Sequence, residues 1–133
     1  MNLLVLSLGF FVIIDLLMLT LIVVSKSRRG FSEEERKKYA LIWSKIAKMD
    51  KKQAIIEADK LLAELLRKSG YRCSLRANLI KAGPVFSDIN ALWSAHKLRN
   101  KLVHELGVCF KEETLVKALN DYKRAYRDLG LKL

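Results

Sequence analysis

Apolar side chains fill the chain from residue 3 to residue 24 almost without a break. Leu, Val, Ile and Phe dominate this run, and the other residues in it are Ser7, Gly9, Asp15, Met18 and Thr20. A helix of this length, at about 1.5 Å rise per residue, reaches across a bilayer core. The pattern predicts a transmembrane anchor over residues 1–25. The carboxyl of Asp15 would either make a polar contact for helix association or be tolerated there.

The alternative for this segment is a cleaved secretory signal. Such a signal would begin with basic residues and end at a small-residue cleavage site. Met1 and Asn2 supply no basic group, and the positive cluster of Lys26, Arg28 and Arg29 lies at the far end instead. The positive-inside rule places such a cluster in the cytoplasm. We therefore expect a single-pass protein of the inner or plasma membrane, with its C-terminal domain in the cytoplasm.

Beyond a basic linker, residues 26–32, apolar side chains recur at the i, i+3, i+4 spacing of amphipathic helices. The caps and glycine stops predict five helices: from Ser32 to about Met49, from Asp50 to Gly70, from Leu75 to Ala82, from Ser87 to near Gly107, and through Leu115 to Gly130. No alternating strand pattern competes with them. The predicted fold is all-α, an antiparallel bundle of four to five helices over residues 33–133.

The charge is strongly positive and uneven. The chain has 25 Lys and Arg residues against 14 Asp and Glu, a formal net charge of +11, and nearly all of these residues follow the apolar run. Such an excess favours polyanions as partners, either nucleic acid or an anionic membrane surface. Cys73 and Cys109 are too few for a disulfide framework, and zinc-ligand spacings are missing. We expect no metal and no cofactor.

The stretch from Trp93 to Glu105 departs from the simple amphipathic pattern. On a helical projection His96, Arg99 and Asn100 fall on the same face as Leu92, a face that a helix normally buries. Buried polar and ionisable groups are costly unless they are paired or used in function. This stretch is therefore where we look first for a functional site.

The sequence Arg99-Asn100-x-x-x-His104 resembles the R-x(4–6)-H signature of the HEPN superfamily. The resemblance covers roughly residues 33–130. It implies a small α-helical bundle, and for many members a metal-independent ribonuclease whose site is shared between two protomers. A homodimer with RNA as substrate is thus implied here.

The residues of the motif have the chemistry that metal-free RNA cleavage needs. His104 can take or give a proton near neutral pH, and Arg99 offers a planar, permanently charged fork for phosphoryl oxygens. Asn100, one turn before His104, can orient the imidazole or contact substrate. Lys97 and Lys101 most simply form part of the solvent-exposed face of the helix. Their functional interpretation is that they contact the phosphates of bound RNA.

Other roles are open for the same residues. Arg99 can neutralise a carboxylate of the second helix, where Glu57 and Asp59 flank the apolar stripe. His104 can cap the C-terminal end of its helix. The position of His96 favours a buried histidine with its hydrogen bonds made inside the core over a catalytic residue.

Three functions follow from these alternatives: a dimeric endoribonuclease with Arg99 and His104 catalytic, a bundle that binds RNA or a nucleotide without cleaving it, and a structural dimerisation domain. No aromatic side chain is obviously exposed for base stacking, so sequence-specific RNA recognition is not expected.

Overall fold

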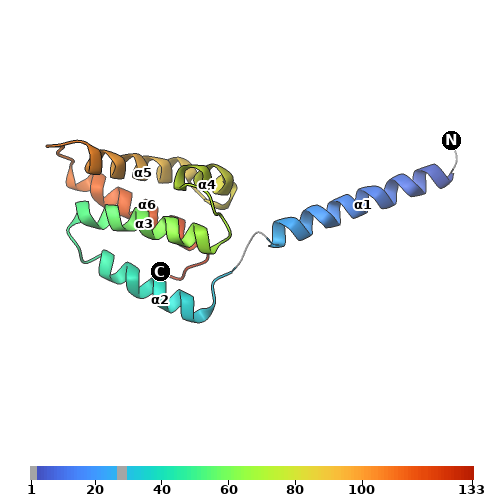
Figure 1. Ribbon diagram of the computed structural model, residues 1–133, viewed down its shortest axis with the longest axis horizontal. Helices are drawn as coiled ribbons and strands as arrows, with labels where there is room; N and C mark the ends of the chain where they lie inside the picture. The colour runs from blue at the N-terminus through green and yellow to red at the C-terminus, as the bar shows by residue number, and fades with distance from the viewer. Residues whose placement is uncertain (1–2, 27–29) are drawn as a thin grey trace.

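The computed structural model describes residues 3–26 and 30–133 of the chain (Figure 1). Its helices are α1 Leu3–Lys26, α2 Glu33–Ile46, α3 Lys51–Lys68, α4 Leu75–Ala82, the short 3-10 helix η1 Gly83–Val85, α5 Ile89–His104 and α6 Glu112–Asp128. These residues contain no strand. The all-α helical prediction is confirmed. Residues 27–29, within the predicted basic linker, lie outside the described residues, as do residues 1–2 of the predicted anchor.

Side-chain caps fix where the helices begin. At the start of α2, the Glu35 backbone N–H donates to Ser32 Oγ at 3.2 Å and the Ser32 N–H donates to Glu35 Oε2 at 3.0 Å, a complete capping box. Asp50 caps α3 through the Lys52 N–H. Side-chain chemistry within four residues decides these boundaries, which explains why they could be predicted from the sequence.

The start of α5 differs from the prediction by one residue. Asp88 caps the helix, with its Oδ1 accepting from the Ala91 N–H at 2.9 Å. The predicted cap, Ser87, instead donates from both its backbone N–H and its hydroxyl to Asp128 Oδ2 of α6, each at 2.9 Å. This contact spans 41 residues of sequence, so no local pattern could have indicated it.

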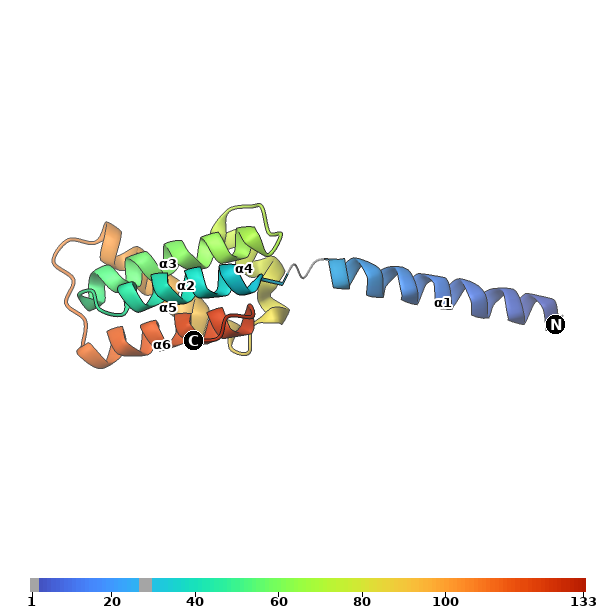
Figure 2. The same ribbon diagram turned by 90° about the horizontal axis from the view of Figure 1, so that it is seen from below.

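α3 is the central helix of the bundle and packs against α2, α5 and α6. In Figure 1, α3 and α6 lie between α5 above and α2 below. Figure 2 shows α6 along the lower edge of the bundle, beside α2 and α3. The contacts on three sides leave several α3 side chains without solvent exposure: Ala54, Ile55, Ala58, Leu62, Leu65 and Leu66. Any polar group on these faces of α3 must find its partner inside the protein.

The membrane prediction requires correction. Among the described residues, no helix is both long enough and apolar enough to span a membrane. The predicted transmembrane anchor over residues 1–25 is therefore wrong, and so is the predicted single-pass localisation.

Candidate functional site

A buried carboxylate, Asp59 of α3, joins three helices. Its side chain is 5% exposed. Its Oδ1 accepts from the Tyr122 hydroxyl of α6 at 2.8 Å and lies 2.8 Å from His96 Nδ1 of α5. Its Oδ2 lies 3.4 Å from Nε of Arg99, also on α5. Every partner of this acid thus comes from a helix that packs against α3.

The four polar groups of α3 and α5 form a closed ring. Arg99 Nη1 donates to Asn100 Oδ1 at 3.0 Å, and Asn100 Nδ2 lies 3.4 Å from His96 Nε2. Because the amide oxygen of Asn100 is occupied by Arg99, its NH₂ group faces the imidazole, and Nε2 is the acceptor. The proton of neutral His96 is then on Nδ1, directed at Asp59. The ring therefore sets the orientation and the tautomer of His96.

Two buried tyrosines close the inner side of this site. The Tyr122 hydroxyl meets Asp59, and the Tyr126 hydroxyl donates to the Ala58 carbonyl at 2.6 Å. Burial, and next the negative charge of Asp59, raises the pKa of both phenols well above the ordinary value. Both hydroxyls therefore stay protonated and act as hydrogen-bond donors.

Alkaline pH is expected to destabilise the bundle through these two phenols. Above about pH 10 the unfolded chain releases their protons while the folded chain retains them, so the stabilisation present below pH 10 decreases by about 1.4 kcal/mol per pH unit and per tyrosine. Urea denaturation at pH 9, 10 and 11 measures the decrease. In Tyr122→Phe the free energy of unfolding should fall less steeply with pH than in the wild type, by the contribution of one tyrosine. An unchanged pH dependence would show that the Tyr122 hydroxyl does not stay protonated in the folded chain.

The outer side of the ring opens into a depression between α4 and α5, with a volume of about 590 Å³. We call it the α4–α5 depression, and its lining residues are Arg76, Ile80, Asn90, Trp93, Ser94, His96, Lys97 and Asn100. Arg76 and Lys97 are exposed and make no ion pair within the described part of the chain. The depression therefore combines free positive charge with an indole, an imidazole and amide groups.

The residues predicted from the sequence are distributed unevenly around this site. Lys97 and Asn100 line the depression, and Arg99 lies behind them against Asp59. Lys101 lines a neighbouring hollow of about 350 Å³ between α5 and α6, which shares Ser94 and Lys97 with the depression. His104 is the exposed last residue of α5 and is not part of the ring.

Of the two acids considered for Arg99, Asp59 is the one that it meets. Glu57 lies elsewhere on α3, where its Oε1 accepts from Lys60 Nζ at 2.8 Å and from Gln53 Nε2 at 3.0 Å. Sequence reasoning assigned His96 to the core and so missed its place in the site. The available signal was the spacing of His96, Arg99 and Asn100, which places all three on one side of α5.

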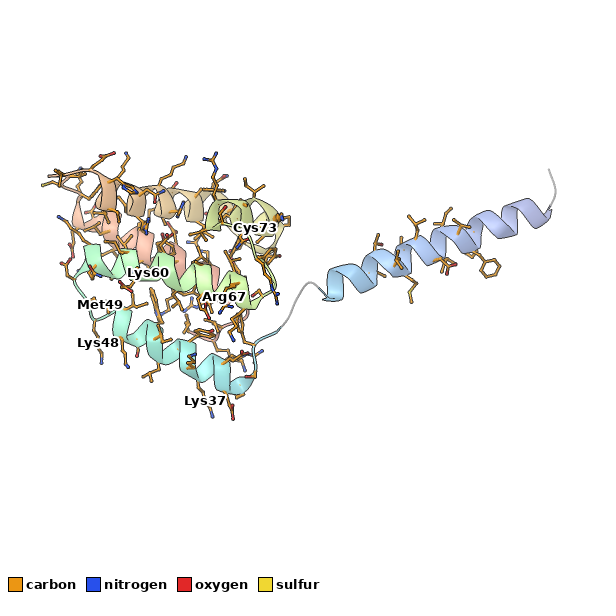
Figure 3. All side chains as sticks on the ribbon, in the orientation of Figure 1. Lys37, Lys48, Met49, Lys60, Arg67 and Cys73 are labelled. Carbon is orange, nitrogen blue, oxygen red and sulfur yellow. The ribbon has the colours of Figure 1, made fainter. Side chains whose placement is uncertain are left out.

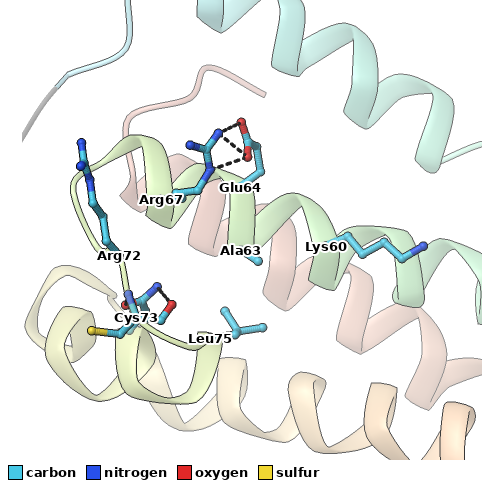
Figure 4. A pocket seen from close by; sticks show the side chains of 8 residues that line it. Lys60, Ala63, Glu64, Arg67, Arg72, Cys73 and Leu75 are labelled. Atoms are coloured by element: carbon cyan, nitrogen blue, oxygen red, sulfur yellow. Dashed lines mark hydrogen bonds and ion pairs between the residues drawn. The ribbon is translucent and has the colours of Figure 1, made fainter.

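A hollow of about 690 Å³ beside α3 and the start of α4 is a weaker site. Figure 4 shows its lining, with Arg67 held by Glu64 through ion-paired hydrogen bonds of 3.0–3.1 Å. Lys60, also in the lining, is paired with Glu57. Two of its cations are thus already neutralised, which leaves less charge for an anionic ligand.

No family model matches this chain, and no curated protein or solved structure matches it either. The predicted membership of the HEPN superfamily is therefore wrong. The motif that suggested it spans six residues with only three fixed positions, and such a pattern occurs readily by chance on an α-helix. The described residues also contain no group of three or more His, Cys, Asp or Glu side chains that could hold a metal ion. The site must therefore be interpreted from its own geometry.

Proposed function

We propose that this chain binds single-stranded RNA, with the α4–α5 depression as the point of contact. The observation that carries the proposal is the position of two unpaired cations, Arg76 and Lys97, beside the indole of Trp93. Proteins that bind single strands combine positive charge for the phosphates with aromatic faces for the bases. The net charge of +11 supplies the long-range attraction for such a polyanion.

The ring behind the depression supports binding as a scaffold. Asp59 and Arg99 hold each other, and Asn100 and His96 are held in turn by Arg99 and Asp59. In this arrangement Arg99 positions the wall of the site and its charge is partly neutralised, so the phosphate contacts fall to the exposed cations. This is the non-catalytic alternative of the sequence analysis, with Asp59 as the partner of Arg99.

Removing both cations of the depression is expected to weaken RNA binding about 30-fold, since each of the two charge-assisted phosphate contacts contributes roughly 1 kcal/mol. Fluorescence anisotropy with a labelled single-stranded RNA measures the Kd of wild type and of Arg76→Ala/Lys97→Ala. Because fewer counterions are released, the slope of log affinity against log salt should become shallower by about 1.4.

The matched control removes two exposed lysines from the other side of the bundle. Figure 3 shows Lys37 on α2 and Lys48 just beyond its end, well away from α4 and α5. The Lys37→Ala/Lys48→Ala variant changes the net charge by the same amount. Equal weakening in both double variants would show that general charge, and not the depression, holds the RNA.

A further inference from the structure

We propose that the α4–α5 depression also cleaves the RNA that it binds, with His96 as the general base. This inference rests on the proposed RNA binding and adds a reaction to it. The substrate class is a single-stranded RNA with a free 2′-hydroxyl next to the bound phosphate. The motif histidine of the sequence analysis, His104, has no part in this assignment.

The imidazole of His96 is arranged as a general base requires. Nδ1 lies 2.8 Å from the buried carboxylate of Asp59, whose own position is fixed by the Tyr122 hydroxyl. Nε2, the nitrogen on the Asn100 side, carries the lone pair, and His96 belongs to the lining of the depression. A carboxylate behind one nitrogen stabilises the imidazolium that forms when the other nitrogen takes a proton.

Access to His96 is limited but present. Its side chain is 13% exposed, and the neighbour of Nε2, the Asn100 amide, is 3.4 Å away, a long hydrogen bond. A substrate hydroxyl can replace so weak a partner, and the Asn100 NH₂ group is then free to donate to a phosphate oxygen. Trp93, whose ring centre lies 6.0 Å from that of His96, provides an apolar wall for the adjacent base.

Positive charge is placed where the reaction would develop negative charge. Arg76 comes from α4 and Lys97 from α5, and both line the same depression as His96. Neither is held by an acid in the described residues, so both are available to the phosphoryl oxygens of a pentacoordinate transition state. The depression thus joins an oriented base with cationic stabilisation and needs no metal for either role.

The reaction is an intramolecular transesterification. His96 Nε2 accepts the proton of the 2′-hydroxyl while the 2′-oxygen forms a bond to the adjacent phosphorus. The bond from phosphorus to the 5′-oxygen of the next nucleotide breaks, and that oxygen takes a proton from water. The products are a 2′,3′-cyclic phosphate and a free 5′-hydroxyl. The imidazolium then returns its proton to solvent, with no change in oxidation state.

The test incubates the full chain with a labelled single-stranded RNA in EDTA and separates the products by size. We expect cleavage by the wild type, fragments ending in 2′,3′-cyclic phosphate, and no cleavage of a 2′-O-methyl oligonucleotide that is still bound. His96→Gln should cleave about 100-fold more slowly or worse, the usual contribution of a general base, when compared with the wild type at RNA concentrations that saturate each protein by anisotropy. Its circular dichroism is compared with that of the wild type.

His104→Gln is the matched control, since it removes the other histidine of α5 and should cleave at the wild-type rate. Loss of cleavage in His104→Gln, normal cleavage by a folded His96→Gln, or products with other ends would each overturn the assignment. If His96→Gln does not fold, the assignment is judged from the other two results: His104→Gln must cleave at the wild-type rate, and the fragments must end in 2′,3′-cyclic phosphate. RNA binding without cleavage overturns this inference alone, whereas absence of binding overturns the proposed function as well.

Discussion

Asp59→Ala is expected to lower the free energy of unfolding by about 3–5 kcal/mol, the usual cost of removing one partner from a buried charged pair. The carboxylate meets three side chains, from His96, Arg99 and Tyr122, on two other helices. Alanine leaves the Tyr122 hydroxyl buried without an acceptor and the guanidinium of Arg99 without its acid. Urea denaturation followed by tryptophan fluorescence measures the change, because Trp43 and Trp93 both report on the bundle.

Glu57→Ala is the control for this substitution. It removes a carboxylate two residues away on the same helix, where the partners are Gln53 and Lys60 on the surface. Surface pairs of this kind contribute about 0–1 kcal/mol. Similar losses for Asp59→Ala and Glu57→Ala would mean that the ring around His96 does not stabilise the bundle.

Leu62→Ala is expected to cost about 2–5 kcal/mol, the range for a large-to-small change in a packed core. Leu62 has no solvent exposure, and it lies on α3, which is packed on three sides by α2, α5 and α6. With little freedom for α3 to move towards any one neighbour, most of the lost volume remains as a cavity. The same urea experiment measures the effect.

Leu41→Ala removes the same atoms from a position on α2 that is 57% exposed. It should change the free energy of unfolding by less than about 0.5 kcal/mol, as is usual for surface substitutions. If the two leucine variants are equally stable, α3 is not the centre of the core.

The five helices of the bundle could be predicted because their signals are local. A serine three residues before a glutamate, as at Ser32 and Glu35, specifies a helix start within a single turn. The positions of Gly70 and Gly130 were equally informative, since both adopt positive φ at helix ends, 103° and 105°, where other residues are strained.

The site could be predicted only in part, because its contacts are distant in sequence. Asp59 is 37 residues from His96 and 63 from Tyr122, and helical periodicity says nothing about which faces of two helices meet. The sequence therefore left Glu57 and Asp59 as equal partners for Arg99. Trp93 is a further example: it packs against the core and also lines the depression, and the second role depends on how α4 and α5 lie against each other.

The loop between α5 and α6 offers a practical route into this protein. Leu106 is fully exposed, and Gly107 turns the chain at φ 73° with nothing within 4 Å of where a Cβ would lie. Exposed loop tips of this kind tolerate inserted sequence well. An affinity tag or a fluorescent reporter placed after Gly107 would lie outside the α4–α5 depression, so a labelled chain could be used to test the proposed RNA contacts without altering that depression.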